Sequence, residues 1–208
     1  MIICFTLGQS RADTIALSAT ENGAFSATED LTLGWAFTLS SAALLTQLGI
    51  WDGPTSLTST AGDGLAQSHT VTIWTSAGVQ QTQATVPSGG GPETDNFRYV
   101  TLPNPVFLSL GSYTIGAFFA ANSPDTFILG ANTVTTASGV SYNGSRSTPG
   151  NAFPPGDFMG FSNSYFGPNF QFNNVITEPV PELGSSCLLL LLGLTATATL
   201  KRFVPRQA

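Results

Sequence analysis

Several short segments of this chain alternate large apolar side chains with small or polar ones. In the segment GWAFTL, Trp35, Phe37 and Leu39 fall on one face, and YTIGAFF from residue 113 alternates in the same way. A period of two is typical of a strand that buries one face. Turn signals built on Gly, Pro and Asp separate the segments, at residues 52–54, 63–64, 76–78, 103–105 and 110–111. The pattern predicts an all-β domain, an antiparallel β-sandwich of jelly-roll-like form.

The alternating segments lie between residues 13 and 177, which we expect to form the sandwich domain. The segment SSAALLTQL, residues 40–48, has a length that fits a short helix or a strand, and its β context favours a strand over residues 44–50. Two hairpins are expected, at residues 69–86 and 97–119. Residues 141–161 are rich in Gly, Pro, Asn and Ser, which predicts a loop across one face of the sandwich before a last strand near Phe170 and Phe172.

Charged residues are few: they make up 9% of the chain, and the formal net charge is −6. Between residues 13 and 177 the basic residues are Arg98 and Arg146, against ten acidic ones. Such a body lacks the basic surface that nucleic acids and anionic lipids require, so we expect no nucleic-acid partner. A cation or a neutral sugar is a better match, as a ligand, to the acidic body between residues 13 and 177. Both cysteines, Cys4 and Cys187, lie outside this body, which excludes a disulfide framework or a cysteine zinc site within it.

Residues 1–12, MIICFTLGQSRA, have features of a secretory leader. Ser10 and Ala12 place small residues at the −3 and −1 positions of a signal-peptidase site, with cleavage before Asp13. A leader also carries a basic start, which these residues lack. We therefore expect residues 1–12 to be a residual signal peptide whose start lies upstream of Met1, and the alternative is a first strand.

An apolar run from Cys187 to Leu200 precedes a basic end of the chain. The run is apolar on every face, and it is shorter than the ~20 residues that usually span a bilayer. A basic cluster directly after an apolar run marks the cytoplasmic end of a membrane segment, which disfavours a buried core helix. We expect residues 187–208 to form one short C-terminal transmembrane helix with a basic tail. A Pro-rich tether at residues 178–186 would join it to the domain.

The order of these features resembles the PEP-CTERM protein-sorting signal of exported bacterial proteins. The motif corresponds here to Val180, Pro181 and Glu182, and Leu183 stands where that family usually has Pro. The resemblance covers about residues 178–206, and its remaining parts are a membrane segment with Gly184, Leu188, Leu192 and Leu200 and a basic stop of Lys201, Arg202 and Arg206. It implies export, transient anchoring in the inner membrane, processing by an exosortase-type enzyme, and a final place at the cell surface or outside the cell.

The order of segments in the body resembles a small extracellular β-sandwich of the DUF4082-like type. The matching stretch runs from VTIWTSAG through FRYVTL to LGSYTIGAFF, within roughly residues 30–130. Such modules are similar to carbohydrate-binding domains, so the resemblance adds a sugar to the ligands that we consider.

Residues suited to catalysis are scarce. His69 is the only histidine of the chain, at the expected start of a strand, and no Gly-x-Ser-x-Gly elbow presents a nucleophile. We therefore interpret His69 as a structural polar residue. The neighbouring carboxylates Glu29 and Asp30, or Glu93 and Asp95, would serve glycoside hydrolysis only if they faced each other across a cleft. We expect no enzyme.

Two kinds of ligand site remain. Asp52 and Asp63 bracket a loop rich in Ser and Thr, whose oxygens suit calcium, although turn chemistry alone also explains both Asp-Gly pairs. Calcium is the one cofactor that the sequence suggests. Candidates for stacking on sugar rings are Trp51 and Trp74 and, in expected loops, Tyr142, Tyr165 and Phe166. Burial in the core is the alternative for each of these rings.

We expect an exported, non-catalytic protein that is sorted to the cell envelope or extracellular matrix and has a structural or matrix-interaction role. The alternative function is a carbohydrate-binding module that attaches to exopolysaccharide. The expected partners are an exosortase-type enzyme, the membrane through the C-terminal segment and, under the alternative, exopolysaccharide.

Overall fold

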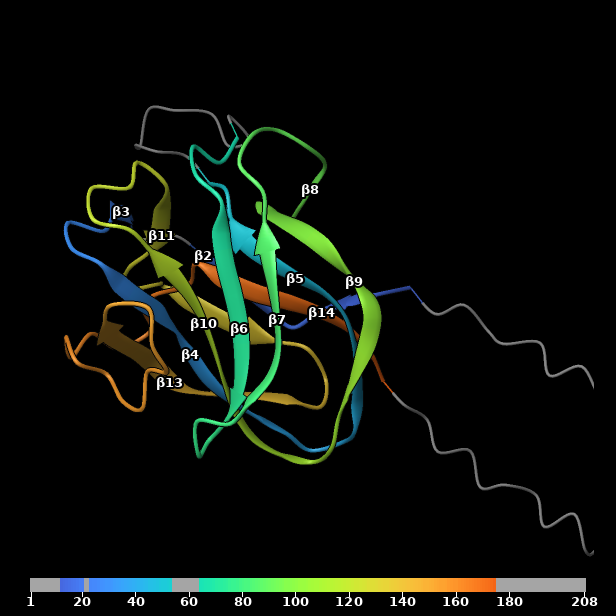
Figure 1. Cartoon of the computed structure of the whole chain (residues 1–208). Coiled ribbons are helices and arrows are strands. Elements are labelled where there is room, and N and C mark those ends of the chain that lie inside the picture. The colour runs from blue at the N-terminus through green and yellow to red at the C-terminus, as the bar shows by residue number, and fades with distance from the viewer. Residues whose placement is uncertain (1–11, 21–22, 54–63, 175–208) are drawn as a thin grey trace, which may run out of the picture. The chain divides into compact units, whose positions relative to one another are not determined.

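The computed structural model describes residues 12–20, 23–53 and 64–174, and within these ranges every regular element is a β-strand (Figure 1). The all-β prediction is therefore confirmed for this part of the chain. The strands are β1 (Thr14–Ile15), β2 (Leu17–Thr20), β3 (Ala24–Ser26), β4 (Leu31–Leu39), β5 (Ala43–Trp51), β6 (His69–Thr75), β7 (Gln80–Val86), β8 (Glu93–Thr94), β9 (Phe97–Leu108), β10 (Gly111–Phe119), β11 (Thr126–Ile128), β12 (Thr133–Thr136), β13 (Val140–Pro149) and β14 (Pro168–Asn174).

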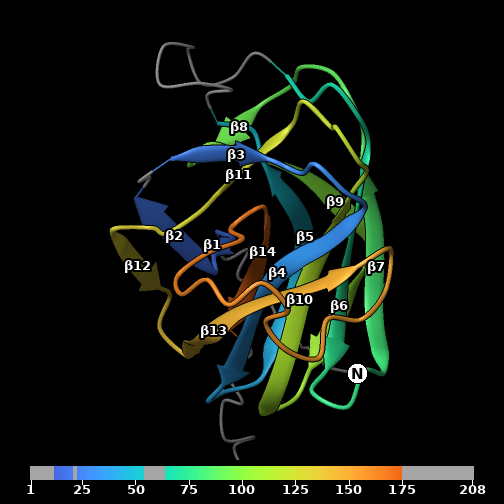
Figure 2. The ribbon, with the colours of Figure 1, turned by 90° about the vertical axis from the view of Figure 1, so that its left-hand side faces the viewer.

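Two five-stranded antiparallel sheets make up the body of the fold, as two layers (Figures 1 and 2). Sheet 1 has the order β1-β14-β5-β9-β8, and sheet 2 has the order β13-β4-β10-β6-β7. Two small sheets, β11 with β3 and β12 with β2, complete the described part. The antiparallel, sandwich-like arrangement agrees with the period of two in the sequence.

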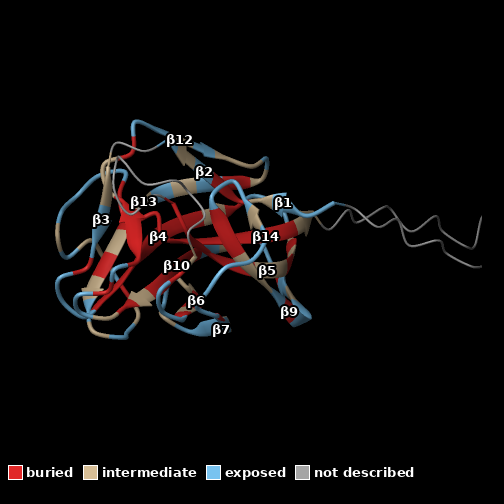
Figure 3. Ribbon diagram, turned by 90° about the horizontal axis from the view of Figure 1, so that it is seen from above, coloured by how far each residue is buried: buried red, intermediate tan, exposed pale blue. Residues whose placement is uncertain are grey.

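The core lies between the two sheets. Trp35 and Phe37 of β4 face it, and their rings lie 5.9 and 4.9 Å from the ring of Phe170 on β14. The indole Nε1 of Trp35 donates a hydrogen bond of 2.9 Å to the carbonyl of Pro168, which joins the two sheets directly. Burial is concentrated on β4, β5, β10 and β14, whereas most of β7 is exposed or half-buried (Figure 3).

One expected hairpin is confirmed and the other is wrong. β6 and β7 pair around a turn at residues 76–78, where Gly78 has a φ of +82° that favours glycine. β9, by contrast, pairs with β5 in sheet 1, and β10 pairs with β4 and β6 in sheet 2. The short connection at residues 109–110 therefore carries the chain from one sheet to the other. β5 itself confirms the strand interpretation of residues 44–50.

The turn expected at residues 103–105 is also wrong, because these residues lie within β9. The register between β5 and β9 jumps there: Leu45 faces Val106, whereas Gln47 faces Thr101. Residues 102–105 therefore lie in an irregularity of the ladder. Proline lacks the N–H group that a regular ladder position requires, so it is tolerated at an irregularity, where that hydrogen bond is not needed.

The loop expected at residues 141–161 begins instead as a strand. β13 occupies residues 140–149 and pairs with β4, with an irregularity between Tyr142 and Ser145. The remainder does lie over the outer face of sheet 2, where the Thr32 hydroxyl donates a 2.7 Å hydrogen bond to the carbonyl of Gly150. The Phe153 ring lies 5.8 Å from that of Trp74. This cover explains why both faces of β4 are buried.

The predicted leader before residue 12, the tether at 178–186 and the membrane segment at 187–208 lie outside the described residues. Among the residues that are described, no helix has the length and apolar character needed to cross a membrane.

Candidate functional site

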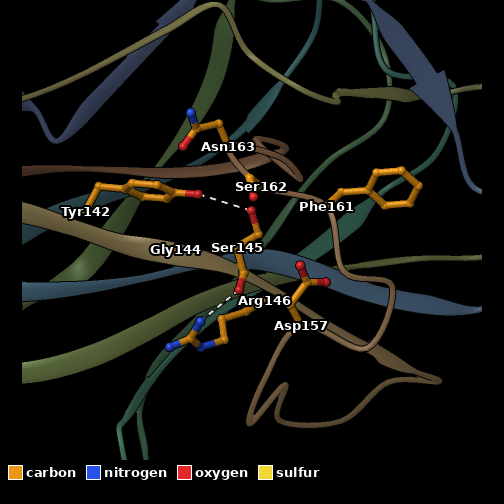
Figure 4. A pocket seen from close by; sticks show the side chains of 8 residues that line it. All are labelled: Tyr142, Gly144, Ser145, Arg146, Asp157, Phe161, Ser162 and Asn163. Carbon is orange, nitrogen blue, oxygen red and sulfur yellow. Dashed lines mark hydrogen bonds between the residues drawn. The ribbon is translucent and has the colours of Figure 1, made fainter.

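A hollow opens on the surface between β13 and the loop that precedes β14 (Figure 4). This first hollow has a volume of about 350 Å³. Its lining residues are Tyr142, Gly144, Ser145, Arg146, Asp157, Phe161, Ser162 and Asn163. The bulge in β13 contributes to its shape, because Gly144 adopts a φ of +104° there and the pairing with β4 passes directly from Tyr142 to Ser145.

Asp157 is held in place by three hydrogen bonds to one of its carboxylate oxygens. Oδ1 accepts from the Ser147 hydroxyl at 3.0 Å and from the backbone N–H groups of Met159 and Gly160 at 3.2 and 2.9 Å. The side chain thereby caps its own turn and is tied to β13. These bonds fix the orientation of the whole carboxylate at the edge of the hollow.

Ser145 connects the strand side of the hollow to the loop side. Its hydroxyl lies 3.1 Å from the Tyr142 hydroxyl and accepts a 2.9 Å hydrogen bond from the backbone N–H of Ser164. Its carbonyl accepts a 2.8 Å hydrogen bond from the guanidinium of Arg146 (Figure 4). Burial raises the pKa of Tyr142 above its usual value of 10.0, so this phenol is neutral and can donate at neutral pH.

Tyr165, whose ring lies 6.4 Å from that of Phe161, is fully buried, and its hydroxyl has no hydrogen-bond partner among the described residues. Burial, followed by the nearby charge of Asp157, raises the pKa of Tyr165 to about 12. The residue has a φ of +65°, and Asn163 has one of +48°. A bulky side chain in this region costs about 1–3 kcal/mol, and such strain is concentrated at functional sites.

A second hollow, of about 280 Å³, is also lined by Asp157. Its lining residues are Ser147, Thr148, Pro155, Gly156, Asp157 and Phe158. Phe158 is 68% exposed, and Phe161, in the first hollow, is 49% exposed. Asp157 therefore lines both hollows, and each hollow also has one exposed aromatic ring in its lining.

The tryptophans predicted to stack on sugars lie elsewhere. Trp51 is only 2% exposed, so its ring presents no face to a ligand. Trp74 is half-buried on the outer face of sheet 2, against Phe153. Tyr165 and Phe166 are fully buried. Tyr142 alone among the predicted aromatic residues lines a hollow, and it does so from a strand rather than a loop.

The carboxylate predicted to bind calcium is engaged by an arginine. Asp52 is buried, and its Oδ2 accepts a hydrogen bond from Nε of Arg98. The same guanidinium also bonds to the carbonyl of Gly91 and, at 2.8 Å, to Glu93. Asp63 lies outside the described residues, so the calcium site at Asp52 and Asp63 stays a prediction. Within the described ranges, no group of three or more His, Cys, Asp or Glu side chains is placed to hold a metal ion.

The carboxylate pairs considered for hydrolysis also have structural partners. Asp95 accepts a hydrogen bond from the Ser18 hydroxyl, and Glu93 contacts Arg98. Asp30 accepts a 2.7 Å hydrogen bond from the backbone N–H of Ala121. Neither Glu93 and Asp95 nor Glu29 and Asp30 line one of the two hollows.

His69 begins β6 and is buried, as its interpretation as a structural residue predicts. Its Nδ1 lies 3.0 Å from the carbonyl of Phe118, and its Nε2 lies 2.9 Å from Oδ2 of Asp125. Both ring nitrogens are therefore engaged, and neither is left to deprotonate a serine.

Tyr142 is the only residue of the two hollows that sequence reasoning named as a ligand residue. The charged residues and exposed rings that it missed are Arg146, Asp157, Phe158 and Phe161. The sequence features that could have pointed to these residues are weak. Arg146 is one of only two basic residues in the body, and both phenylalanines lie in a segment rich in Gly and Pro, where a buried strand is not expected.

No protein-family model, no curated protein and no solved structure matches the chain.

Proposed function

We propose that the β-sandwich domain is a non-catalytic binding module for neutral saccharides, with its site at the two hollows beside Asp157. The observation that carries this proposal is that Asp157 lines two hollows, each of which also has an exposed aromatic side chain in its lining, Phe161 in the first and Phe158 in the second. Exposed aromatic side chains with an apolar face and a few fixed polar groups around them are typical of ligand sites.

The polar groups fit the hydroxyls of a sugar. The Asp157 carboxylate accepts hydrogen bonds, while the guanidinium of Arg146 and the amide of Asn163 donate them. Because both signs of charge line the first hollow, and because the body carries ten acidic residues against two arginines, a neutral ligand is favoured over a polyanion.

The number of carboxylates that line the two hollows supports a non-catalytic role. Asp157 is the only carboxylate among the residues that line the two hollows. Glycoside hydrolysis canonically requires a pair flanking the scissile bond. A single carboxylate that is fixed by three hydrogen bonds suits binding rather than proton transfer.

For the whole chain, we propose export and sorting to the cell envelope or extracellular matrix, as the resemblance to the PEP-CTERM signal at Val180, Pro181 and Glu182 implies. We also propose an exosortase-type enzyme as a partner and a C-terminal transmembrane helix as the transient anchor. For the domain itself, we propose that the strands are connected as in a jelly roll. A saccharide-binding domain gives such a protein a contact with exopolysaccharide after its release.

Affinity electrophoresis of the full chain, solubilised in detergent, tests the proposed function. The gels contain neutral polysaccharides (dextran, pullulan, mannan and galactomannan) or the acidic alginate and polygalacturonate. We expect retardation by at least one neutral polymer, and Asp157→Asn should weaken it about tenfold or more because a hydrogen bond to a charged group is lost. The variant keeps an Oδ1 acceptor for Ser147, Met159 and Gly160, so the turn is preserved.

The matched control is Asp95→Asn, which makes the same chemical change at an exposed turn outside both hollows. Asp95 has a φ of +56°, which asparagine also tolerates. Equal loss of binding in both variants, retardation by the acidic polymers alone, or no retardation by any polymer would contradict the proposed function.

A further inference from the structure

Asp157 lines both hollows, which makes them neighbours on the surface, and we call the two hollows together the β13 groove. The first hollow lies toward Tyr142 and Arg146, and the second lies toward Thr148. Both are lined by the same strand, β13, and successive residues of a strand advance by about 3.3 Å. The hollows therefore follow one another along β13. Between them, the backbone of Ser147 is hydrogen-bonded to Gly156 and Phe158, at 2.9 and 3.4 Å, so a ligand that fills both hollows passes over this contact.

Each hollow is small. Ligand pockets for drug-sized molecules typically measure about 300–1,000 Å³. At about 350 and 280 Å³, each hollow is close to the lower limit and suits one ring-sized unit. Each also has its own exposed aromatic ring, Phe161 in the first and Phe158 in the second.

The shared carboxylate suits a linkage between two units. Asp157 is the one residue that lines both hollows, and its orientation is fixed by Ser147 and the backbone of residues 159–160. A ligand that fills both hollows passes this carboxylate, which can accept hydrogen bonds from hydroxyls on either unit. Each of the two units would meet a different exposed aromatic ring, because Phe161 lines the first hollow and Phe158 lines the second.

We propose that the β13 groove binds an internal segment of a saccharide chain, with at least two consecutive sugar units in the two hollows, rather than a single terminal sugar. This inference rests on the proposed function and specifies its ligand class. Both hollows are open to solvent rather than enclosed, so a chain can continue beyond the groove in both directions. Phe158 is then a determinant of specificity for chain length, because it contacts only the second unit.

Isothermal titration calorimetry of the full chain in detergent tests this inference. The probes are malto-, isomalto-, manno- and cello-oligosaccharides of one to six units. For the series that binds, we expect affinity to rise about tenfold or more between one unit and three, and then to level off. Phe158→Ala should remove most of this length dependence. Phe107→Ala, which truncates a ring that is 58% exposed on β9 and lies outside both hollows, should leave the dependence unchanged.

The outcomes separate the inference from the proposed function. Equal affinity for one unit and for three, or length dependence that survives Phe158→Ala, overturns the chain-binding inference and leaves saccharide binding intact. Binding of none of the four series at any length, in a protein that also shows no retardation by neutral polysaccharides, overturns both.

Discussion

At the scale of single residues, the contact between His69 and Asp125 is the clearest polar feature of the interior. Nδ1 of His69 lies 3.0 Å from the carbonyl of Phe118, and its Nε2 lies 2.9 Å from Oδ2 of Asp125. Asp125 also accepts 2.7 and 2.8 Å hydrogen bonds from the backbone N–H groups of Ala66 and Gln67. The pair thereby ties residues 66–67 to the end of β10.

We expect the contact between His69 and Asp125 to make the free energy of unfolding depend on pH in the acidic range. Desolvation alone would raise the pKa of Asp125, but the hydrogen bonds from His69, Ala66 and Gln67 outweigh it, and the pKa is lowered from 3.8. The carboxylate therefore stabilises the fold above its unfolded pKa of about 4, and this contribution is lost as the pH falls through the lower folded value.

Urea unfolding followed by tryptophan fluorescence at pH 7 and pH 3 measures this contribution. At pH 7, Asp125→Asn should lower the free energy of unfolding by about 1–3 kcal/mol, because the amide NH₂ that replaces one carboxylate oxygen leaves a backbone N–H of Ala66 or Gln67 without its acceptor. The decrease caused by Asp125→Asn should be smaller at pH 3, because the carboxylate contributes less to stability there. The control Asp95→Asn, at an exposed residue, should change the free energy of unfolding by less than about 0.5 kcal/mol. An Asp125→Asn protein as stable as the original at pH 7 would contradict the assignment.

At the scale of elements, the centre of sheet 2 depends on a close approach of two strands. A Cβ atom added to Gly34 on β4 would lie 1.9 Å from the carbonyl oxygen of Ile115 on β10 and 2.7 Å from Cα of Gly116. Both neighbours are backbone atoms in a paired strand, so the strands must separate to make room.

Gly34→Ala should therefore lower the free energy of unfolding by about 1–3 kcal/mol. Gly90→Ala is the matched control, because a Cβ atom there meets nothing within 4 Å, and its effect should stay within about 0.5 kcal/mol. Thermal unfolding of the two variants side by side checks the difference. Equal melting temperatures would show that β4 and β10 are less tightly packed than the structure indicates.

Elements with their own periodic pattern could be predicted from the sequence, and elements defined by a partner could not. β4, β6 and β10 alternate clearly, so their strands were expected. β13 is rich in Gly, Ser and Asn and resembles a loop until β4 supplies its hydrogen-bond partner. The connection between β9 and β10 is short enough for a hairpin, and only tertiary packing sends the two strands into different sheets.

The candidate site was less predictable than the fold for the same reason. Trp51 was an attractive ligand residue because it is large and follows a strand, but its burial depends on packing that one segment does not reveal. Arg146 and Asp157 are eleven positions apart in the sequence and line one hollow because β13 and the loop fold against each other. Exposed phenylalanines cannot be told from core ones by residue type alone.

At the scale of the whole molecule, the acidic domain and the C-terminal segment have separate proposed roles. We propose saccharide binding for the described domain, and about residues 178–206 carry the resemblance to a sorting signal. Mass spectrometry of the protein from its native host should find a mature C-terminus near residues 182–186, after removal of the membrane segment. A secreted, soluble protein that still ends in Arg206, Gln207 and Ala208 would contradict the sorting proposal.

Hydrogen–deuterium exchange of the full chain, with and without the best-binding neutral oligosaccharide, tests the central claim most directly. We expect the bound saccharide to slow exchange at residues 142–148 and 156–163, which line the two hollows, and to leave other segments unchanged. Protection confined to residues 86–92 beside Arg98, or to the neighbourhood of Trp51 and Trp74, would place the ligand elsewhere and contradict the assignment of the site.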